Sequence, residues 1–478
     1  MDSVIRNHVN QSIENAPAWV ESWTKNEAGE ILPARHIAVK IQEYVNGYMA
    51  KKSTKRWVIV PGLRGVGKTT ILAQQYNFVR QRYGNRVNML HLSLHDVVNV
   101  VGSNLNLAIQ QYEAIIGSSI ERLDKPTFLF LDEVQEDSKW ADILFSLHER
   151  SRNIFIICTG SSAVHLRMNA NVVRRSHIEP LYPLNYTEYQ MLRFNIMPIT
   201  GLKAKLTQAV FSCTDANQAH EELKKLAPVV GRYRSKIDVG TFIHFMYTGS
   251  LPFLINEDNP AQVYRGIISM IERIVNEDLA KIYNFDGSSL SAVQPLLFML
   301  AEGGDVISRK SLSSALGIDA RIVGNLLDAL VKTELLIEVP ARGATSVAVS
   351  KPRKYLFMSP AIRAAFHQIA GVPATDERRK GFLLEDLVGL YMHREFVTKR
   401  LADFTYNAGT GHADFMLQTA AGKRIPIEVG VGQKGATQVE KTMAEVSSNY
   451  GIVLSSTQLG VDRVRNILYL PLSIFYFM

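Results

Sequence analysis

The residues best suited by type and spacing to do chemistry form a glycine-rich run between a short apolar stretch and a helical pattern. Residues 62–69 read GLRGVGKT and fit the pattern G-x-x-x-x-G-K-[ST]. Glycines let backbone N–H groups turn towards a triphosphate, and the N-terminus of the following helix adds its positive dipole end. Lys68 would neutralise the β- and γ-phosphates, and Thr69 would place its hydroxyl on Mg²⁺; an ordinary glycine-rich turn is the alternative. The residues predicted to bind the nucleotide are Gly62, Arg64, Gly65, Val66, Gly67, Lys68, Thr69 and Thr70.

An acidic pair follows a fully apolar run further along the chain. Residues 128–131 predict a buried strand, which would deliver Asp132 and Glu133 to the C-terminal edge of a sheet. Asp132 could hold the Mg²⁺ shell together with Thr69, and Glu133 could polarise a water molecule for in-line attack on the γ-phosphate. Two solvated acids that cap a strand are the alternative.

Three more residues could act on the γ-phosphate. Thr159 ends the next predicted strand, where its hydroxyl could sense that phosphate or position the attacking water, although Thr159-Gly160 could also belong to a simple turn. Arg174 and Arg175 follow in a polar segment from which a neighbouring subunit could be reached, so a homo-oligomer is part of the prediction. An arginine on the transferring phosphoryl group is worth about 10³–10⁵ in rate. A pair of solvated arginines is the alternative.

Three acids in the C-terminal region have the spacing of a metal-dependent nuclease site. Glu385 lies in a helical pattern, Asp414 opens an apolar strand, and Glu428 follows a second apolar run. Because one hairpin spans the distance between Asp414 and Glu428, the two acids could lie side by side. Such sites bring two or three carboxylates to Mg²⁺ and often add a lysine that steadies the attacking water.

The lysine of such a site is not where the spacing would put it. Gly430 occupies the position two residues after Glu428. Lys434 or Lys441 could bring an ammonium group from another part of the backbone, but nothing in the sequence requires it. Three interpretations stay open: an active nuclease, a degenerate fold that binds DNA or protein, and plain surface acids.

The elements that position the nucleotide residues alternate in type. Residues 57–60, 87–94, 127–132 and 153–158 predict buried strands, with helical patterns between them, and a helical pattern at 36–49 precedes them. This order is typical of a parallel α/β sheet.

From about residue 255 the pattern changes. Two helical stretches, 308–316 and 320–333, are joined by a short turn and followed by possible strands at 335–339 and 346–349. Together they indicate a winged helix-turn-helix. The second helix offers only Arg321 and Asn325 to read bases, so sequence-specific binding is not expected. Lys351, Arg353 and Lys354 could bind phosphates, which favours DNA as a partner without sequence reading; a module used only for packing is the alternative.

Composition is consistent with this organisation. The chain has 478 residues, which suggests about three domains, and its formal net charge is +8. Residues 51–95 hold no acid, so part of that charge surrounds the phosphate loop rather than DNA. Two cysteines favour a reducing compartment, and the sequence shows neither a secretion signal nor an apolar tract of membrane-spanning length. We therefore expect a cytoplasmic protein without membrane contact.

These residues carry a family resemblance. The phosphate loop, residues 131–135 with Trp140, residues 159–163, and residues 181–189 resemble the archaeal-type AAA-like ATPases of prokaryotes. The glycine that commonly precedes the arginine in this family is replaced here, in Val173-Arg174-Arg175.

The resemblance implies an α/β P-loop NTPase core followed by a winged-helix domain and an α+β domain similar to PD-(D/E)xK nucleases. It also implies the cofactors ATP and Mg²⁺, and ATP hydrolysis coupled to a task on DNA in genome maintenance or defence. An ATP-gated binding or assembly module with an inactive nuclease-like domain is the alternative. The expected boundaries are an N-terminal helical segment at 1–50, the ATPase domain at 51–254, a helical region with the winged helix at 255–373, a linker, and the nuclease-like domain at 381–478.

Overall fold

The computed structural model describes residues 2–161, 170–280, 285–303, 308–343, 351–369, 371, 376–409, 411–432, 435–455 and 458–478. The chain divides into two compact units, Met1–Tyr182 and Pro183–Met478. The predicted wing strand at 346–349, Lys434 and the residues 162–163 of the family pattern lie outside the described residues.

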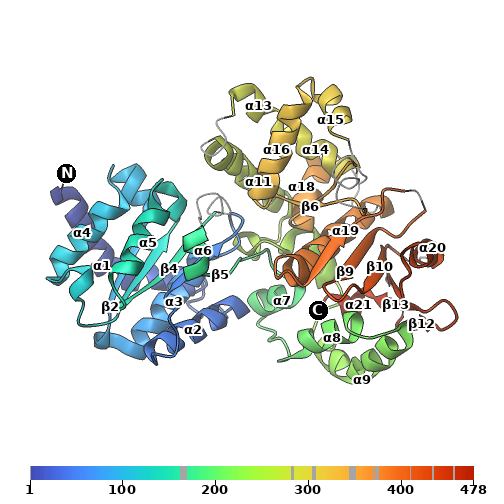
Figure 1. Ribbon diagram of the computed structural model, residues 1–478, viewed down its shortest axis with the longest axis horizontal. Coiled ribbons are helices and arrows are strands. Elements are labelled where there is room, and N and C mark those ends of the chain that lie inside the picture. The colour runs from blue at the N-terminus through green and yellow to red at the C-terminus, as the bar shows by residue number, and fades with distance from the viewer. Residues whose placement is uncertain are drawn as a thin grey trace. The chain divides into compact units, whose positions relative to one another are not determined.

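The first unit is built on one five-stranded parallel sheet with the order β2-β3-β4-β1-β5. Figure 1 shows strands of this sheet among the helices of the unit. Its strands are β1 (Trp57–Pro61), β2 (Asn88–Ser93), β3 (Thr127–Asp132), β4 (Ile154–Gly160) and β5 (His177–Ile178). Strands β1, β3 and β4 are buried along their whole length, which explains why the sequence shows continuous apolar runs rather than alternation. The predicted parallel α/β core is confirmed. Because the three strands are neighbours and parallel, their carboxyl ends meet at one edge.

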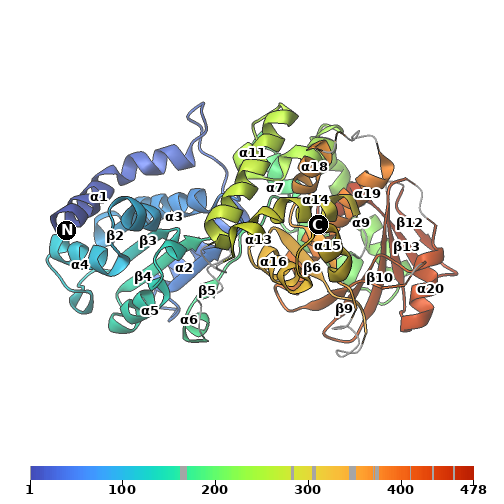
Figure 2. The same ribbon diagram turned by 90° about the horizontal axis from the view of Figure 1, so that it is seen from above.

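Helices cover this sheet. They are α1 (Asp2–Thr24), α2 (His36–Met49), α3 (Lys68–Tyr83), α4 (Leu105–Ile116), α5 (Trp140–Arg150) and α6 (Ala170–Arg175). Helix α3 packs on β3 and β4, whereas α5 contacts β4 and α4. Helix α1 lies within the stretch 1–50 that the sequence predicts as an N-terminal helical segment; it runs beside α3 and α4 (Figure 2) and buries Ile5, Val9, Ala16 and Val20. Spacings of four and seven residues place these side chains on one helix face.

Helices precede the large sheet of the second unit in the chain. They are α7 (Tyr186–Phe194), α8 (Leu202–Phe211), α9 (Ala216–Arg234), α10 (Thr241–His244), α11 (Pro260–Arg273), α13 (Gly287–Ser291), α14 (Val293–Gly303), α15 (Arg309–Leu316), α16 (Ala320–Lys332), α18 (Pro360–Ile369) and α19 (Glu377–Met392). The turn between α15 and α16 uses Gly317 in the left-handed region at φ 67°, where glycine costs little strain. Strand β6 (Leu336–Val339) pairs antiparallel with β7 (Lys354–Phe357).

A six-stranded mixed sheet completes this unit, with the order β12-β13-β11-β10-β9-β8. Its strands are β8 (Ala402–Thr405), β9 (Phe415–Thr419), β10 (Arg424–Val429), β11 (Gly451–Ser455), β12 (Gly460–Asp462) and β13 (Ile467–Pro471), accompanied by α20 (Thr437–Val446) and α21 (Leu472–Phe475). Helix α20 packs on β10 and β11.

The boundary between the two compact units falls inside the stretch 51–254 that the sequence predicts as the ATPase domain. The compact unit that holds the phosphate loop ends at Tyr182, and helix α9 packs against β12 and β13 of the second unit. Helix α19 begins at Glu377, inside the stretch between residues 373 and 381 that the sequence predicts as a linker. Asp376 caps this helix by accepting from the backbone of Arg378 and Arg379, so polar residues here form a helix start.

Among the described helices, none combines the length and the apolar character that crossing a bilayer requires.

Candidate functional site

The glycine-rich loop follows β1 and leads into α3, as the sequence predicts. Gly65 and Gly67 have φ angles of 77° and 93°, a region that side chains with a Cβ rarely adopt. At Gly62 a Cβ atom would lie 2.3 Å from the backbone oxygen of Leu181, so the loop and the chain after β5 approach too closely for any other residue. Each glycine of the pattern therefore has its own steric reason.

Arg35, which the sequence analysis did not identify, binds the backbone of the phosphate loop. Arg35 is buried, and its guanidinium donates to the backbone oxygens of Val66 and Tyr182, both at 2.9 Å. It therefore fixes the loop to the end of the unit's chain. Nothing in the neighbouring sequence marks this arginine, because both acceptors are backbone atoms far away in sequence.

Lys68 and Thr69 form the first turn of α3. The Lys68 ammonium is buried and donates to the backbone oxygens of Gly62 and Leu63 at 2.9 and 3.0 Å, so it lies folded over the loop. Thr69 donates its hydroxyl to Oδ2 of Asp132 at 2.7 Å. The remaining predicted loop residues differ in burial: Val66 is buried, while Arg64 and Thr70 are half-buried.

Asp132 receives donors from three directions. Its Oδ2 accepts from Thr69, and its Oδ1 accepts from the Thr159 hydroxyl and from the backbone N–H of Glu133 at 3.0 Å. The register explains the meeting, because Leu131 pairs with Cys158 and the next residue of each strand reaches the same edge. The structure therefore brings Thr69, Asp132 and Thr159 together.

Glu133 lies directly beyond β3 with φ 52°. Burial raises the pKa of its carboxyl, as does the neighbouring charge of Asp132, while Arg64 and Lys68 partly oppose the rise. A carboxyl with a raised pKa is a better proton acceptor than an ordinary glutamate.

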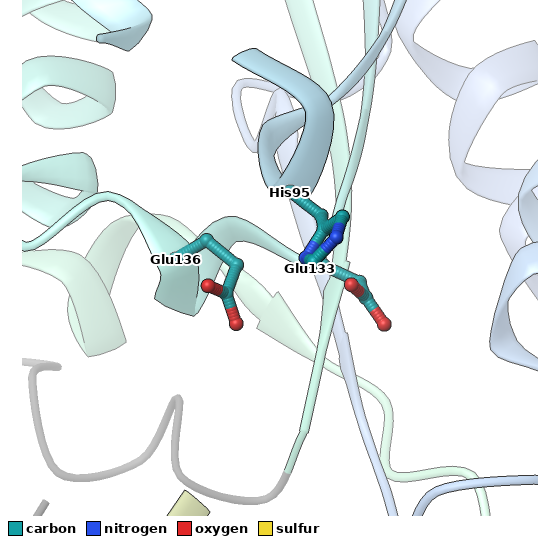
Figure 3. Close-up of side chains that lie close together, drawn as sticks. All are labelled: His95, Glu133 and Glu136. Atoms are coloured by element: carbon teal, nitrogen blue, oxygen red, sulfur yellow. The ribbon is translucent and has the colours of Figure 1, made fainter. Parts of the chain in front are cut away.

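His95 and Glu136 flank Glu133 (Figure 3). One potential ligand atom from each of the three side chains lies within 4.8 Å of the other two. Among the described residues, no other group of three His, Cys, Asp or Glu side chains has this geometry. The Asn99 amide links two of them, at 2.9 Å from Glu136 and 3.2 Å from His95. The sequence did not single out His95 or Glu136, since neither belongs to a recognisable spacing.

The two candidate arginines differ in their surroundings. Both lie in α6, so the predicted polar segment is a short helix. Arg175 makes a bidentate ion pair with Glu149 at 2.6 and 3.1 Å, and its guanidinium lies 4.9 Å from the centre of the Phe145 ring. Arg174 is exposed and has no partner among the described residues of its unit. Arg174 is therefore the freer cation.

The three C-terminal acids lie in the second unit, with Glu385 in α19, Asp414 directly before β9 and Glu428 in β10. Pairing of Phe415 with Ile427 places Asp414 beside Glu428, and Asp414 accepts a 2.7 Å hydrogen bond from the Val429 backbone. Glu385 forms an ion pair with Lys354 of β7. The three carboxylates do not bring one oxygen each within 4.8 Å of the other two.

Comparison with known proteins gives three kinds of match. A family model described as "AAA domain" matches residues 54–190. A protein of Methanocaldococcus jannaschii, described as "Uncharacterized protein MJ1637", is 34% identical over 436 residues, which cover 90% of this chain and 86% of that protein.

Similar solved structures are more distant. The Aeropyrum pernix ORC1 protein in complex with DNA is 13% identical, with a TM-score of 0.33 over 73% of this chain and 96% of that one. The Thermotoga maritima RuvB Holliday junction branch migration motor is 15% identical, with a TM-score of 0.25 over 67% and 94%. The family match and the parallel sheet of the first unit agree on an AAA domain at residues 54–190.

Proposed function

The chain belongs to the same family as the Methanocaldococcus jannaschii protein and carries an AAA-type P-loop ATPase domain, and from this premise we propose that it is a Mg²⁺-dependent ATPase that acts on DNA. In this proposal, ATP binding and hydrolysis act through a winged helix within residues 255–373 and a nuclease-like region at 381–478. The task would lie in genome maintenance or defence.

The observation that carries the ATPase half is the meeting of Thr69, Asp132 and Thr159 beside Glu133. The hydroxyl and carboxylate oxygens of Thr69 and Asp132 are the hard donors that Mg²⁺ prefers, so these residues fit the ion. Mg²⁺, when bound, neutralises charge on the phosphate oxygens.

Each side chain of the site has a separate role in the proposed hydrolysis. Lys68 would exchange the carbonyls of Gly62 and Leu63 for phosphate oxygens, because its ammonium already lies over the loop. Glu133 would hold the proton of the attacking water, and Thr159 would orient that water from the neighbouring strand. Arg174 or Arg175 would place positive charge on the transferring group.

Support for DNA comes from the exposed face of α16. Arg321 and Asn325 are exposed one turn apart, and Lys310 is exposed at the start of α15, next to Arg309, which pairs with Asp328 of α16 at 3.5 Å. Two of the basic residues that the sequence suggested for phosphates have other partners: Arg353 pairs with Glu338 at 2.6 Å, and Lys354 is buried. The proposed DNA surface therefore rests on α15 and α16 rather than on β7.

A decisive experiment measures ATP hydrolysis and DNA binding in one preparation. Wild type should hydrolyse ATP with Mg²⁺, and Lys68→Ala should lose hydrolysis, whereas Lys139→Ala at an exposed position keeps it. Because phosphate contacts release counterions, DNA affinity should fall steeply with salt and should weaken in Arg321→Ala. Hydrolysis by Lys68→Ala at the wild-type rate would disprove the ATPase assignment, and DNA affinity independent of both ATP and Arg321 would disprove the DNA half.

A second candidate function has its own supporting observation. In an ATP-gated binding or assembly module the nuclease-like region is inactive, and the ion pair between Glu385 and Lys354, together with Gly430 in place of a lysine, favours this candidate. Incubation of single- and double-stranded DNA and RNA with Mg²⁺ or Mn²⁺ separates the two. Cleavage that disappears in Asp414→Ala would eliminate the inactive module.

A further inference from the structure

Lys354 occupies an unusual place for a lysine. It is the first residue of β7, it is 7% exposed, and its ammonium forms an ion pair with Glu385 of α19. The same ammonium lies 4.8 Å from the centre of the Phe415 ring, next in sequence to Asp414. It therefore lies between an acid on a helix and an acid at the start of a strand.

The charge of Lys354 is paired within the chain, because its ammonium forms an ion pair with the Glu385 carboxylate.

The other two acids are bound to donors of the protein. Asp414 accepts from the Val429 backbone at 2.7 Å. When the Gln438 amide is oriented with its nitrogen towards Glu428, that nitrogen donates to both carboxylate oxygens, at 2.7 and 2.8 Å. Each of the three acids thus already has a donor or a cation from the chain itself.

This arrangement does not fit the metal ion that the nuclease resemblance implies. A divalent ion needs several oxygens within about 2.0–2.6 Å of itself, so carboxylates that share one ion must converge. Glu385, Asp414 and Glu428 do not form a described group with ligand atoms within 4.8 Å of one another.

We propose that the Lys354 ammonium takes the place of a divalent cation in this cluster, so that the acids are neutralised from within and hold no metal ion. Lys354 comes from the strand that pairs with β6, so the same ion pair also fastens this hairpin to α19. The inference concerns the metal content of the second unit and stands whether or not the chain hydrolyses ATP.

Mn²⁺ binding to the full-length chain tests it. All variants carry Asp132→Asn, which removes the expected metal ligand of the ATPase domain, and free Mn²⁺ is followed by electron paramagnetic resonance. The parent and Glu385→Gln should bind the same number of ions. Lys354→Met, which keeps an unbranched side chain one atom shorter and removes the charge, should bind one more, and Lys354→Met with Asp414→Asn should lose that extra ion.

Two results would overturn the proposal. One is an ion lost from the parent on Glu385→Gln, because the acids would then hold metal beside Lys354. The other is a folded Lys354→Met that gains no ion. If Lys354→Met does not fold, the comparison of the parent with Glu385→Gln and Asp414→Asn still decides, since the proposal requires equal Mn²⁺ content in all three. ATP hydrolysis without Asp132→Asn, measured separately, reports on the proposed function alone.

Discussion

The Thr69 hydroxyl donates a 2.7 Å hydrogen bond to the Asp132 carboxylate and so joins the first turn of α3 to the end of β3 across 63 residues of sequence. Thr159 donates to the other oxygen of the same carboxylate. The two oxygens suited to Mg²⁺ are thus already adjacent, which reduces the ordering required when an ion binds.

Asp132→Asn should lower the kcat for ATP hydrolysis by about 10²-fold, since loss of one preorganised electrostatic group typically costs that much. The amide keeps the size of the side chain but removes its charge and turns one acceptor into a donor. Steady-state hydrolysis at saturating ATP and varied Mg²⁺ measures the change. Asp142→Asn, at an exposed position of α5, is the matched control and should keep the wild-type rate. A wild-type kcat in Asp132→Asn would contradict the role.

Glu133 should set the acidic limb of the pH profile of kcat. Only its ionised form can accept a proton, and burial together with Asp132 raises its pKa above that of an ordinary glutamate. The rate should therefore fall, as pH decreases, at a higher pH than an exposed glutamate would give. Glu133→Gln should lower kcat by about 10²–10⁴ and leave ATP binding intact. An acidic limb that persists unchanged in the residual rate of Glu133→Gln would assign it to another group.

How far the sequence predicts this site depends on how near the residues are in the chain. Gly62 to Thr69 are consecutive, and Asp132 follows an apolar run, so pattern alone predicts them. Arg35 donates to backbone oxygens, and Lys354 forms an ion pair with an acid of another element. Because these partners are distant in sequence, no spacing of residues predicts either contact.

The fold follows the same division. Buried strands such as β3 appear in the sequence as continuous apolar runs, and their existence was predictable. The packing of α9 on β12 and β13 depends on tertiary contacts between distant segments, which no local pattern in the sequence predicts.

Gly62→Ala should disturb the phosphate loop. The new Cβ would lie 2.3 Å from the Leu181 backbone oxygen, and backbone cannot move aside as a side chain can. We expect ATP affinity to drop at least about tenfold, with a cost in stability of about 1–3 kcal/mol from overpacking. Isothermal titration calorimetry and urea unfolding measure both. Gly47→Ala is the control, because its Cβ would meet the Ser53 Cβ at an ordinary 3.7 Å inside α2; if both variants bind ATP equally, the steric argument is wrong.

Asp386→Ala should destabilise the second unit by about 3–5 kcal/mol, because it leaves a buried charge without its partner. Asp386 is fully buried and makes a bidentate pair with Arg363 at 2.6 and 2.9 Å, while the Phe357 backbone donates to it at 2.8 Å. Denaturant unfolding followed by circular dichroism measures the loss of stability. Asp403→Ala, at an exposed position of β8, should change little. Equal stability of the two variants would refute the argument.

Substitution of Arg174 should affect ATP hydrolysis, whereas substitution of Arg175 should affect stability. Arg175 is held by Glu149 and Phe145, so Arg175→Ala should lower the melting temperature of the first unit. Arg174 is exposed, so Arg174→Ala should keep the melting temperature and lose about 10³–10⁵ in kcat, the range known for arginines that reach the transferring phosphoryl group. Arg152→Ala is the exposed control.

Mixing variants shows whether Arg174 acts on a neighbouring subunit. Glu133→Gln and Arg174→Ala should each be inactive alone. If Arg174 crosses an interface, an equimolar mixture contains sites with Glu133 from one subunit and Arg174 from the next, and hydrolysis returns because both groups then meet at one ATP. We expect this recovery, and we expect it to vanish on dilution below the concentration at which subunits associate. Hydrolysis by Arg174→Ala alone at the wild-type rate would exclude any such role, and a mixture that stays inactive would confine Arg174 to its own subunit.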